Sequence, residues 1–303
     1  MSEQTRTKIR EVAAALRYVP IDTGRSLSTR STRRIAIVAS ELTNPFYSEL
    51  VEHLRVEMST AAYRPLLIPD ASDGEDILAT LADGSLDGVI HTTATLGDLL
   101  PHQLQTRGVP TVLVNRGVDG ASIDTCVMDN ETGAAEVAGL LYALGHRLIG
   151  AILGPAATST SRDREIGLRR GAGEHGLQLP ASCVRRGEFT YESGYRSATE
   201  ILDLHEPPSA LFCANDVIAV GACNAAHARG LTLGRDLTLI GFDDIAMARW
   251  EMFGLTTVRC DLSAMAHSAV GLLLDRIDDP ARLAHRVMLQ PQLVLRKSHG
   301  PPA

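Results

Sequence analysis

The sequence predicts an α/β protein in which two lobes, each built on a doubly wound parallel sheet, follow a short helical N-terminal segment. After residue 34, short apolar runs bounded by turn residues alternate with longer stretches of helical periodicity, as expected for strands separated by helices. The runs are apolar throughout, which is typical of parallel strands that helices cover on both faces. Because the runs are too many for one small sheet, we expect two sheets.

The first expected element is a helix within the opening twenty residues. Ser2 is a suitable cap, apolar residues recur at helical spacing between Ile9 and Leu16, and Pro20 ends the pattern. Lysine and arginine lie on the other faces of this helix, so its apolar stripe is narrow. Such a stripe needs a partner surface in order to be buried.

The rest of the chain divides into expected strands and helices in alternation. In doubly wound sheets, ligands bind beyond the C-terminal ends of the strands, so the loops that follow the strands are the candidate binding loops. The expected strands are IAIVA (35–39), PLLIP (65–69), GVIH (88–91), TVLV (111–114), LIGAIL (148–153), ALFCA (210–214) and LTLIGF (237–242), and the expected helices lie near 46–62, 130–145, 159–176, 191–204, 215–229 and 262–278.

Composition indicates a soluble globular protein of about two domains. Of the 303 residues, 45% are hydrophobic and 21% are charged. No apolar run approaches the ~20 residues that span a bilayer, and the N-terminus is not organised as a signal peptide, so we expect a cytoplasmic protein without membrane contact. The five cysteines are scattered and form no CxxC pair, which favours buried thiols over a disulfide framework or a zinc site.

Catalytic motifs are absent from the sequence. It contains no GxSxG, Walker or HExxH pattern, and no two histidines have metal-ligand spacing. Asp243 and Asp244 are adjacent at the end of an expected strand, where neighbouring side chains point in different directions, unlike a general acid and base that face one substrate. We therefore expect no enzyme, no cofactor and no metal site.

Charge is distributed unevenly along the chain. Residues 1–34 hold eight Lys or Arg against three Asp or Glu, whereas the remaining residues hold 21 basic and 33 acidic side chains. A basic arm on an acidic body favours a polyanion contact confined to the arm, because the body repels nucleic acid. The alternative is that the arm is a solvated, partly disordered tail.

The loops after the expected strands share a polar character. SELTNPFYSEL follows the first strand, NRG follows TVLV, and STSRDREIG, RGEFTYESG, ANDVIAVG and FDDIA occupy similar positions later in the chain. Their Asn, Asp, Arg and aromatic residues suit a polar, hydroxyl-rich ligand, which arginine and carboxylates bind through several hydrogen bonds and a ring covers on its apolar face. Asn and Asp also cap helices, so Asn44, Asp129 and Asn215 have a structural alternative.

These residues resemble the lac repressor/galactose repressor family of bacterial transcription regulators. The resemblance runs from Ser2 to about Lys297. Its landmarks, weak singly but specific in this order and spacing, are SEQTR, the segment Arg25-Ser26-Leu27, TNPFY, VMDNETGA, LGHRLIG, SRDREIGLR, ANDVIAVG, GFDD and LTTVR.

The resemblance implies a fold and a division of the chain. The family has an N-terminal helix-turn-helix headpiece, a short hinge helix, and a two-lobed core similar to periplasmic sugar-binding proteins, with three crossings between the lobes. We accordingly assign residues 1–34 to a truncated headpiece and hinge, and residues 35–303 to the effector-binding core. Within the core, one lobe takes about 35–130 and 261–289, and the other takes about 131–260 and 290–303.

The resemblance also implies an effector pocket between the lobes. Arg164, in SRDREIG, matches the arginine that commonly binds effector hydroxyls or carboxylates, although it can instead pair with Asp163 or Glu165. The other residues carried over are Asn215 and Asp243 as polar contacts, Phe189 as a ring that stacks on sugars, Phe46 in the first pocket loop, and Asp129 at a lobe crossover, where it serves the ligand or the hinge.

The resemblance places the start of this chain within the headpiece. In the family, a sequence like SEQTR begins the third headpiece helix, so the first two helices lie upstream of the chain as given. Met1 stands where valine is frequent, and we hypothesise that the true start of the gene lies upstream. Because no recognition helix is available for the major groove, we expect the 303-residue chain to lack sequence-specific DNA binding.

Arg25, Leu27 and Arg30 are assigned to the hinge and its DNA contact. In the family, the hinge leucine wedges between base pairs in the minor groove, and Leu27 either does so or packs on the core. Ile21 and Gly24 replace the Asn and Ala of the family pattern. Glycine costs a helix ~1 kcal/mol relative to alanine, so this hinge should fold less readily on its own.

Two functions from different classes follow. The first is a homodimeric transcription regulator that binds a small polar effector and, in its full-length form, changes its affinity for operator DNA. The second is a cytoplasmic small-molecule binding protein that has lost DNA recognition. Sugars, sugar derivatives and nucleosides all fit as effectors. Cys260 stands where the family frequently has Gln, which suggests a less polar pocket on that side.

Overall fold

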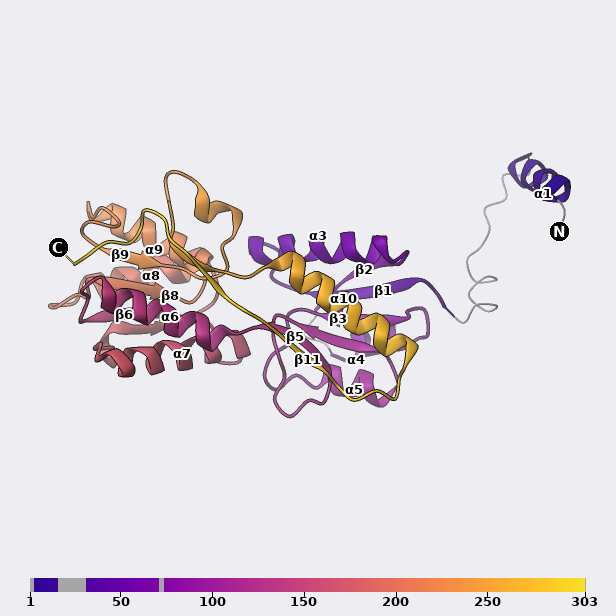
Figure 1. Cartoon of the computed structure of the whole chain (residues 1–303), viewed down its shortest axis with the longest axis horizontal. Helices are drawn as coiled ribbons and strands as arrows, with labels where there is room; N and C mark the ends of the chain where they lie inside the picture. The colour runs from indigo at the N-terminus through magenta and orange to yellow at the C-terminus, as the bar shows by residue number, and fades with distance from the viewer. Residues whose placement is uncertain (1–2, 16–30, 71–73, 303) are drawn as a thin grey trace.

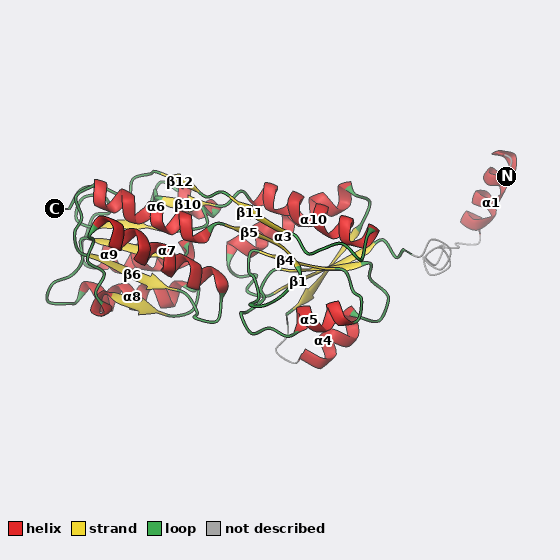
Figure 2. Ribbon diagram, turned by 60° about the horizontal axis from the view of Figure 1, so that its bottom comes forward, coloured by secondary structure: helices red, strands yellow, loops and turns green. Residues whose placement is uncertain are grey.

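The computed structural model describes residues 3–15, 31–70 and 74–302. Two α/β bodies lie end to end along its long axis (Figure 1). The predicted N-terminal helix is present as α1 (Glu3–Ala15), and it lies apart from both bodies in Figures 1 and 2. Val12 of the predicted apolar stripe is 51% exposed. The hinge assignments Arg25, Leu27 and Arg30 lie outside the described residues.

The first body is a six-stranded sheet with the order β11-β5-β4-β3-β1-β2. Every strand pair in it is parallel, as predicted. Its strands are β1 (Arg34–Ala39), β2 (Arg64–Pro69), β3 (Gly88–His91), β4 (Thr111–Val114), β5 (Asp124–Met128) and β11 (Arg286–Leu289), and its helices are α3 (Pro45–Thr60), α4 (Gly74–Leu81), α5 (Leu100–Thr106) and α10 (Leu262–Asp278).

Helices cover both faces of this sheet, which explains why IAIVA is apolar throughout. Ile35 and Ile37 join the main core, which includes buried leucines of α3. Ala36 and Val38, on the opposite face, join a separate cluster with leucines of α4 and α5. Successive side chains of a strand point to opposite faces, so the residues of this run pack alternately against apolar side chains on the two faces of the sheet.

The strand β2 corrects the prediction that PLLIP is buried. It forms and pairs in parallel with β1, but it is the edge of the sheet. Leu66 and Leu67 are 40% and 47% exposed. An edge strand has one side uncovered, and the sequence does not reveal which apolar run takes that position.

The second body is a four-stranded parallel sheet with the order β7-β6-β8-β9. Two closely packed helix pairs, α6 with α7 and α8 with α9, accompany it (Figure 2). Its elements are α6 (Asn130–Ala143), β6 (Ile149–Leu153), α7 (Ser159–His175), η1 (Ala181–Cys183), β7 (Val184–Arg186), α8 (Tyr191–Leu202), β8 (Ala210–Cys213), α9 (Asp216–Ala228), β9 (Thr238–Ile240) and η2 (Ala246–Arg249).

The chain passes between the two bodies near residues 128–130, 259–262 and 289–292. A short antiparallel pair formed by β10 (Thr257–Arg259) and β12 (Gln292–Val294) lies beside two of these connections. The short strands β5, β7, β10, β11 and β12 were not predicted, because runs of three to five residues with mixed polarity carry little periodic signal.

The five cysteines are free and buried, which confirms the prediction of buried thiols. Burial raises the pKa of the Cys126 thiol to about 12, so this thiol is unreactive at neutral pH. None of the helices in the described segments combines the length and apolarity needed to cross a membrane.

Glycines bring α6 and α7 into close contact. A Cβ atom at Gly167 of α7 would overlap the backbone of Glu131, and one at Gly171 would lie 2.9 Å from the Ala135 carbonyl oxygen. Backbone atoms cannot move aside as a flexible side chain can. This close approach positions the start of α6 beside α7.

Substitution of Gly167 tests this packing. Gly167→Ala should lower the midpoint of urea unfolding, with a cost of about 1–3 kcal/mol, because the added methyl group forces the two helices apart. Gly173→Ala is the matched control on the same helix, since nothing lies within 4 Å of its added Cβ, and it should be neutral or stabilising by up to ~1 kcal/mol. Equal effects of the two substitutions would contradict the packing argument.

Candidate functional site

The carboxyl ends of strands from both bodies meet at a small cleft with a cavity volume of about 10 Å³. Loops after β1 and β4 contribute from one side, and loops after β8 and β9 together with α7 contribute from the other. All the predicted pocket residues except Asp129 lie among its lining residues, which are Asn44, Phe46, Tyr47, Asn115, Thr160, Arg164, Phe189, Asn215 and Asp243.

Arg164 projects from α7 and is only 3% exposed. Its Nε donates to Asn130 Oδ1 (2.8 Å), its Nη1 to the carbonyl oxygen of Ala214 (2.5 Å), and its Nη2 to Asp243 Oδ1 (2.9 Å). Its guanidinium carbon also lies 3.8 Å from the centroid of the Phe242 ring. Three separate segments of the second body therefore hold this one side chain in place.

Arg164 does not use the acidic residues beside it in the sequence. Asp163 pairs with Arg162 and Glu165 pairs with Arg169, each at 2.8 Å. Consecutive residues of a helix point in different directions, so the neighbours of an inward-facing arginine lie on the helix surface. The alternative pairing considered from the sequence is wrong.

Asp243 is buried in the loop after β9, where its φ of 112° is rare for a residue with a side chain. Burial raises the pKa of its carboxyl group to about 6, although Arg164 opposes this effect. The next residue, Asp244, pairs instead with Arg259 (2.6 Å) and Arg296 (2.5 Å). The two adjacent carboxylates serve different partners, as the sequence predicted.

Three of the candidate residues are helix N-caps. Asn44 Oδ1 accepts from Phe46 N (3.1 Å), Asn215 Oδ1 from Ile218 N (2.9 Å), and Asp129 Oδ1 from Thr132 N (3.0 Å). Asn44 and Asn215 also line the cleft, so their amide nitrogens remain for a ligand. Asp129 lies outside the cleft lining, and its cap is the role that the geometry supports.

Aromatic rings form the apolar part of the cleft. Phe46 packs edge-on against Tyr47, with ring centroids 5.3 Å apart. Phe189, from the loop between β7 and α8, packs against Gly154, where any side chain would overlap the ring. One ring therefore lies on each side of the cleft.

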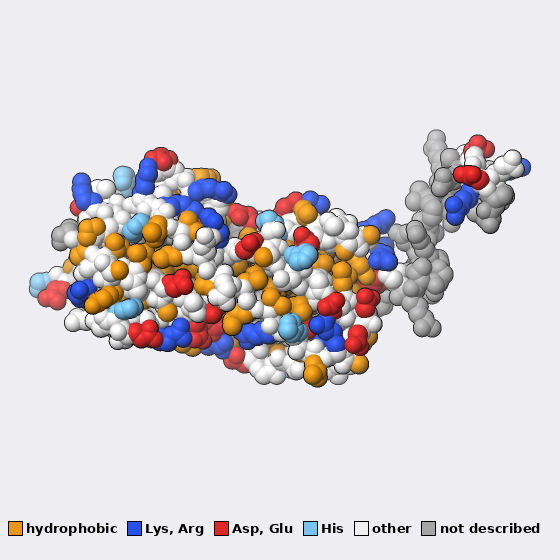
Figure 3. Space-filling model, viewed as in Figure 1, with side chains coloured by type: hydrophobic (Ala, Val, Ile, Leu, Met, Phe, Trp, Pro, Cys, Tyr) orange, Lys and Arg blue, Asp and Glu red, His pale blue; other side chains and the backbone are white. Residues whose placement is uncertain are grey.

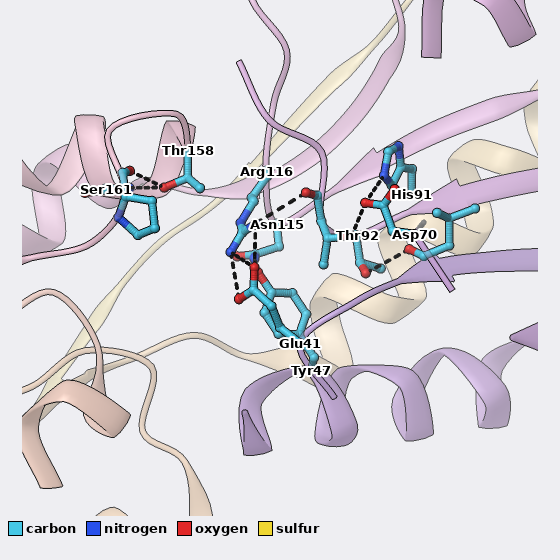
Figure 4. A network of polar contacts seen from close by, with 12 residues as sticks. Glu41, Tyr47, Asp70, His91, Thr92, Asn115, Arg116, Thr158 and Ser161 are labelled. Atoms are coloured by element: carbon cyan, nitrogen blue, oxygen red, sulfur yellow. Dashed lines mark hydrogen bonds and ion pairs between the residues drawn. The ribbon is translucent and has the colours of Figure 1, made fainter. Parts of the chain in front are cut away.

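Tyr47, Asn115 and Arg116 were not singled out from the sequence. Asn115 Nδ2 donates to the Tyr47 hydroxyl (3.3 Å), and Asn115 has a left-handed backbone with φ 68°. Arg116 lies close to both, with its guanidinium group held by Glu41 (Figure 4). The sequence signal for Asn115 and Arg116 was the NRG tripeptide, which directly follows the strand TVLV.

Direct contacts join the two bodies at this cleft. Leu96 N donates to the Ala157 carbonyl oxygen (2.8 Å), and Gly117 N donates to Ser159 Oγ (2.9 Å). An ion pair joins Arg162 to Asp119 at 2.7 Å. These contacts are polar, and they lie beside a core of buried apolar residues that continues from one body into the other.

Comparison with known proteins places the fold and the cleft in context. A model of the periplasmic binding protein-like domain matches residues 138–299. The HTH-type transcriptional repressor PurR of Klebsiella pneumoniae (strain 342) is 30% identical over 303 residues, covering 98% of this chain and 89% of the relative. A crystal structure of a regulatory protein of the LacI family from Chloroflexus aggregans has a TM-score of 0.79 at 26% identity, covering 89% of this chain and 99% of that chain. The chain belongs to the lac repressor/galactose repressor family.

Other members of the family extend the likeness. The transcriptional regulator CelR in complex with cellobiose has a TM-score of 0.83 at 29% identity, covering 98% of this chain and 91% of that chain. The lac repressor bound to ONPG in the repressed state has a TM-score of 0.86 with the same coverage, and at 24% identity it shows the fold alone. The relatives named here are transcriptional regulators, and none is named as an enzyme.

The raised pKa of Asp243 predicts a pH dependence of stability. In the unfolded chain this carboxyl group ionises near its ordinary pKa of 3.8, whereas in the folded state it ionises near 6. Its contribution to stability is therefore fully present below pH 3.8 and is lost as the pH rises through about 6, which amounts to about 3 kcal/mol.

The measurement compares the wild type with Asp243→Asn. The free energy of unfolding of the wild type minus that of the variant, obtained from urea unfolding between pH 4 and 8, should fall by about 3 kcal/mol as the pH rises. Subtracting the variant removes the contributions of the other titrating groups. A difference that does not vary with pH would rule out the raised pKa.

Proposed function

We propose that this protein is an effector-responsive transcription regulator that binds a small, polar, hydroxyl-rich ligand in the cleft and changes its affinity for operator DNA. A sugar, a sugar derivative or a nucleoside suits the cleft. The observation that carries the proposal is the convergence of amide, guanidinium and carboxylate groups and three aromatic rings on one space between the bodies. Names of relatives, including a CelR–cellobiose complex, support it.

The proposed effector contacts are Arg164, Asn215, Asp243, Phe46 and Phe189, which all line the cleft. Asp243 supplies an acceptor for ligand hydroxyl groups, and Asn215 supplies a donor. The rings of Phe46 and Phe189 suit the apolar face of a sugar or a base. Arg164 is already bonded to protein groups on every side, so we assign it chiefly to fixing Asp243 and secondarily to direct contact.

Effector entry requires the two bodies to separate. The cavity volume of about 10 Å³ is far below the ~300 Å³ at which small-molecule pockets usually begin. We propose that the lobes, taken as 35–130 with 261–289 and 131–260 with 290–303, rotate about the three connecting segments. The polar contacts across the cleft, such as the Arg162–Asp119 pair, break in that motion at little cost because they are partly exposed.

DNA contact is assigned to the N-terminal arm rather than to the core. Acidic and basic side chains are interspersed over the face of the two bodies shown in Figure 3, which offers no continuous basic surface. Pairing of two arms in a homodimer would match a palindromic operator. The residues after position 34 carry the acidic excess, which disfavours a phosphate contact on the core.

The cap residue Asn215 provides a clean test of the cleft. A thermal-shift screen of sugars and nucleosides first identifies a ligand, which must raise the stability of the folded state. Asn215→Ser keeps a capping oxygen but removes the amide donor, so calorimetry should show about tenfold weaker binding, or ~1.4 kcal/mol, with little change in unfolding temperature.

Asp129→Ser is the matched control for Asn215→Ser. It also replaces one capping residue by another, at the start of α6 and outside the cleft lining. Its affinity for the same ligand should equal that of the wild type. Weakened binding in both variants, or in neither, would argue against the assigned cleft.

Coupling between effector and DNA tests the regulatory output. In a longer form that carries a helix-turn-helix, the effector and a selected operator duplex should change each other's affinity by one common factor. The 303-residue chain should bind DNA weakly, without sequence preference, and lose that binding as salt rises. Fluorescence anisotropy with operator and random duplexes measures both. Equal operator affinity with and without effector would favour a binding protein without DNA output.

A further inference from the structure

Arg116, which follows β4, lies between the two bodies at the edge of the cleft. It is 2% exposed, and its guanidinium carbon lies 5.4 Å from the ring centroid of Tyr47 in the first body and 5.7 Å from that of Phe189 in the second. Both rings line the cleft. A buried positive charge therefore lies beside two rings of the cleft lining, one of which, Phe189, we assign to the effector.

The hydrogen bonds of Arg116 are long and incomplete. Its Nη1 and Nη2 donate to the Glu41 carboxylate at 3.2–3.3 Å, and Nη1 also donates to the Thr93 carbonyl oxygen at 3.3 Å (Figure 4). Its Nε is buried and has no hydrogen-bond partner among the described residues. Charge-assisted bonds of arginine usually measure about 2.7–2.9 Å, so this guanidinium is under-coordinated.

Arg164, which lines the cleft, is by contrast fully hydrogen-bonded. Its Nε, Nη1 and Nη2 donate at 2.5–2.9 Å to three different protein oxygens. Both arginines are almost fully buried, where an unsatisfied donor calls for an explanation. The unused hydrogen-bond donor therefore belongs to Arg116, beside the rings that line the cleft.

Glu41 is a replaceable partner for this arginine. Its side chain is 39% exposed, against 3% for that of Arg116, so the carboxylate is readily hydrated when it leaves, whereas the buried guanidinium then needs another anion. Its backbone has φ 56°, a left-handed conformation that residues with side chains rarely adopt. The arginine is fixed by burial, whereas the carboxylate reaches it from a strained loop on the surface.

We propose that Arg116 is a specificity-determining residue that binds an anionic group of the effector, a carboxylate or a phosphate, and that this group takes the place of the Glu41 carboxylate. The planar guanidinium fork matches either anion through two parallel hydrogen bonds. The effector class is then an acidic sugar derivative or a phosphorylated sugar or nucleoside. This inference rests on the proposed effector function of the cleft.

The test removes the Glu41 carboxylate and offers free anions in its place. In Glu41→Ala, acetate or phosphate at about 100 mM should raise the unfolding temperature by about 2–4 °C above the effect of the same anion on the wild type, at equal ionic strength set with chloride. Response to acetate alone assigns a carboxylate, and response to phosphate assigns a phosphate. No extra response to either anion would overturn the proposal.

Two further variants locate the effect. Glu52→Ala removes an exposed carboxylate of α3 that pairs with Arg55 at 2.7 Å, and it should respond to anions as the wild type does. Adding Arg116→Lys to Glu41→Ala keeps the positive charge but removes the fork, so the extra response should shrink by at least half. An undiminished response would place the anion elsewhere and overturn the proposal.

The role of Arg116 and the proposed function of the cleft are tested by separate experiments, so either can fail without the other. The anion test needs no effector, whereas the Asn215→Ser comparison needs no anion. Identification of an effector that binds the cleft but has neither a carboxylate nor a phosphate would overturn the role of Arg116 and leave the proposed function standing.

Discussion

The buried guanidinium of Arg164 is the interaction on which the cleft side of the second body depends. It connects the start of α6, the end of β8 and the loop after β9 through Asn130, Ala214 and Asp243. A buried charge is tolerated only when it is paired and hydrogen-bonded, so these three segments must converge for the body to be stable. Removing Arg164 would leave the Asp243 carboxylate buried without its partner, which links the integrity of the fold to that of the site.

Close helix packing makes this convergence possible. Gly167 and Gly171 let α7 approach the backbone of α6, and that approach brings Asn130, the first residue of α6, within hydrogen-bond distance of Arg164. Asn44 of the first body and Asn215 of the second each cap a helix and line the cleft. Helix N-termini carry a partial positive charge, so the starts of α3 and α9 favour electron-rich ligand groups. Elements that stabilise the fold thus also set the polarity of the site.

The buried arginines that the two bodies place near the cleft differ in how completely they are hydrogen-bonded. Arg164 is saturated within the second body, whereas Arg116 of the first body has an unused donor and an exposed carboxylate as its main partner. Its stacking on Phe189 and the polar contacts across the cleft add to the apolar core that the two bodies share. A ligand that satisfies Arg116 would strengthen the closed arrangement, because it would replace weak contacts with stronger ones. This is how binding in a small cleft can be coupled to the relative position of two lobes.

The sequence by itself determined the elements with a strong local signal. Uninterrupted apolar runs such as IAIVA identified the central strands, and apolar residues at helical spacing identified the long helices. Both patterns depend only on which faces of an element are covered. The polar loops after those strands predicted where a ligand binds, because strand ends are displayed directly in a linear sequence. The family resemblance then singled out Arg164, Asn215, Asp243, Phe46 and Phe189 as proposed contacts.

Only the tertiary structure decided the partners and the neighbours. PLLIP became an exposed edge because strand order depends on long-range pairing, and Arg164 found Asp243, 79 residues away, instead of the acids beside it. Asp129 proved to be a cap outside the cleft lining, and the under-coordinated Arg116 emerged between rings of different bodies. The physical reason is common to all four: hydrogen bonds and burial are fixed by proximity in space, and the sequence specifies proximity only along the chain and within a few helical turns.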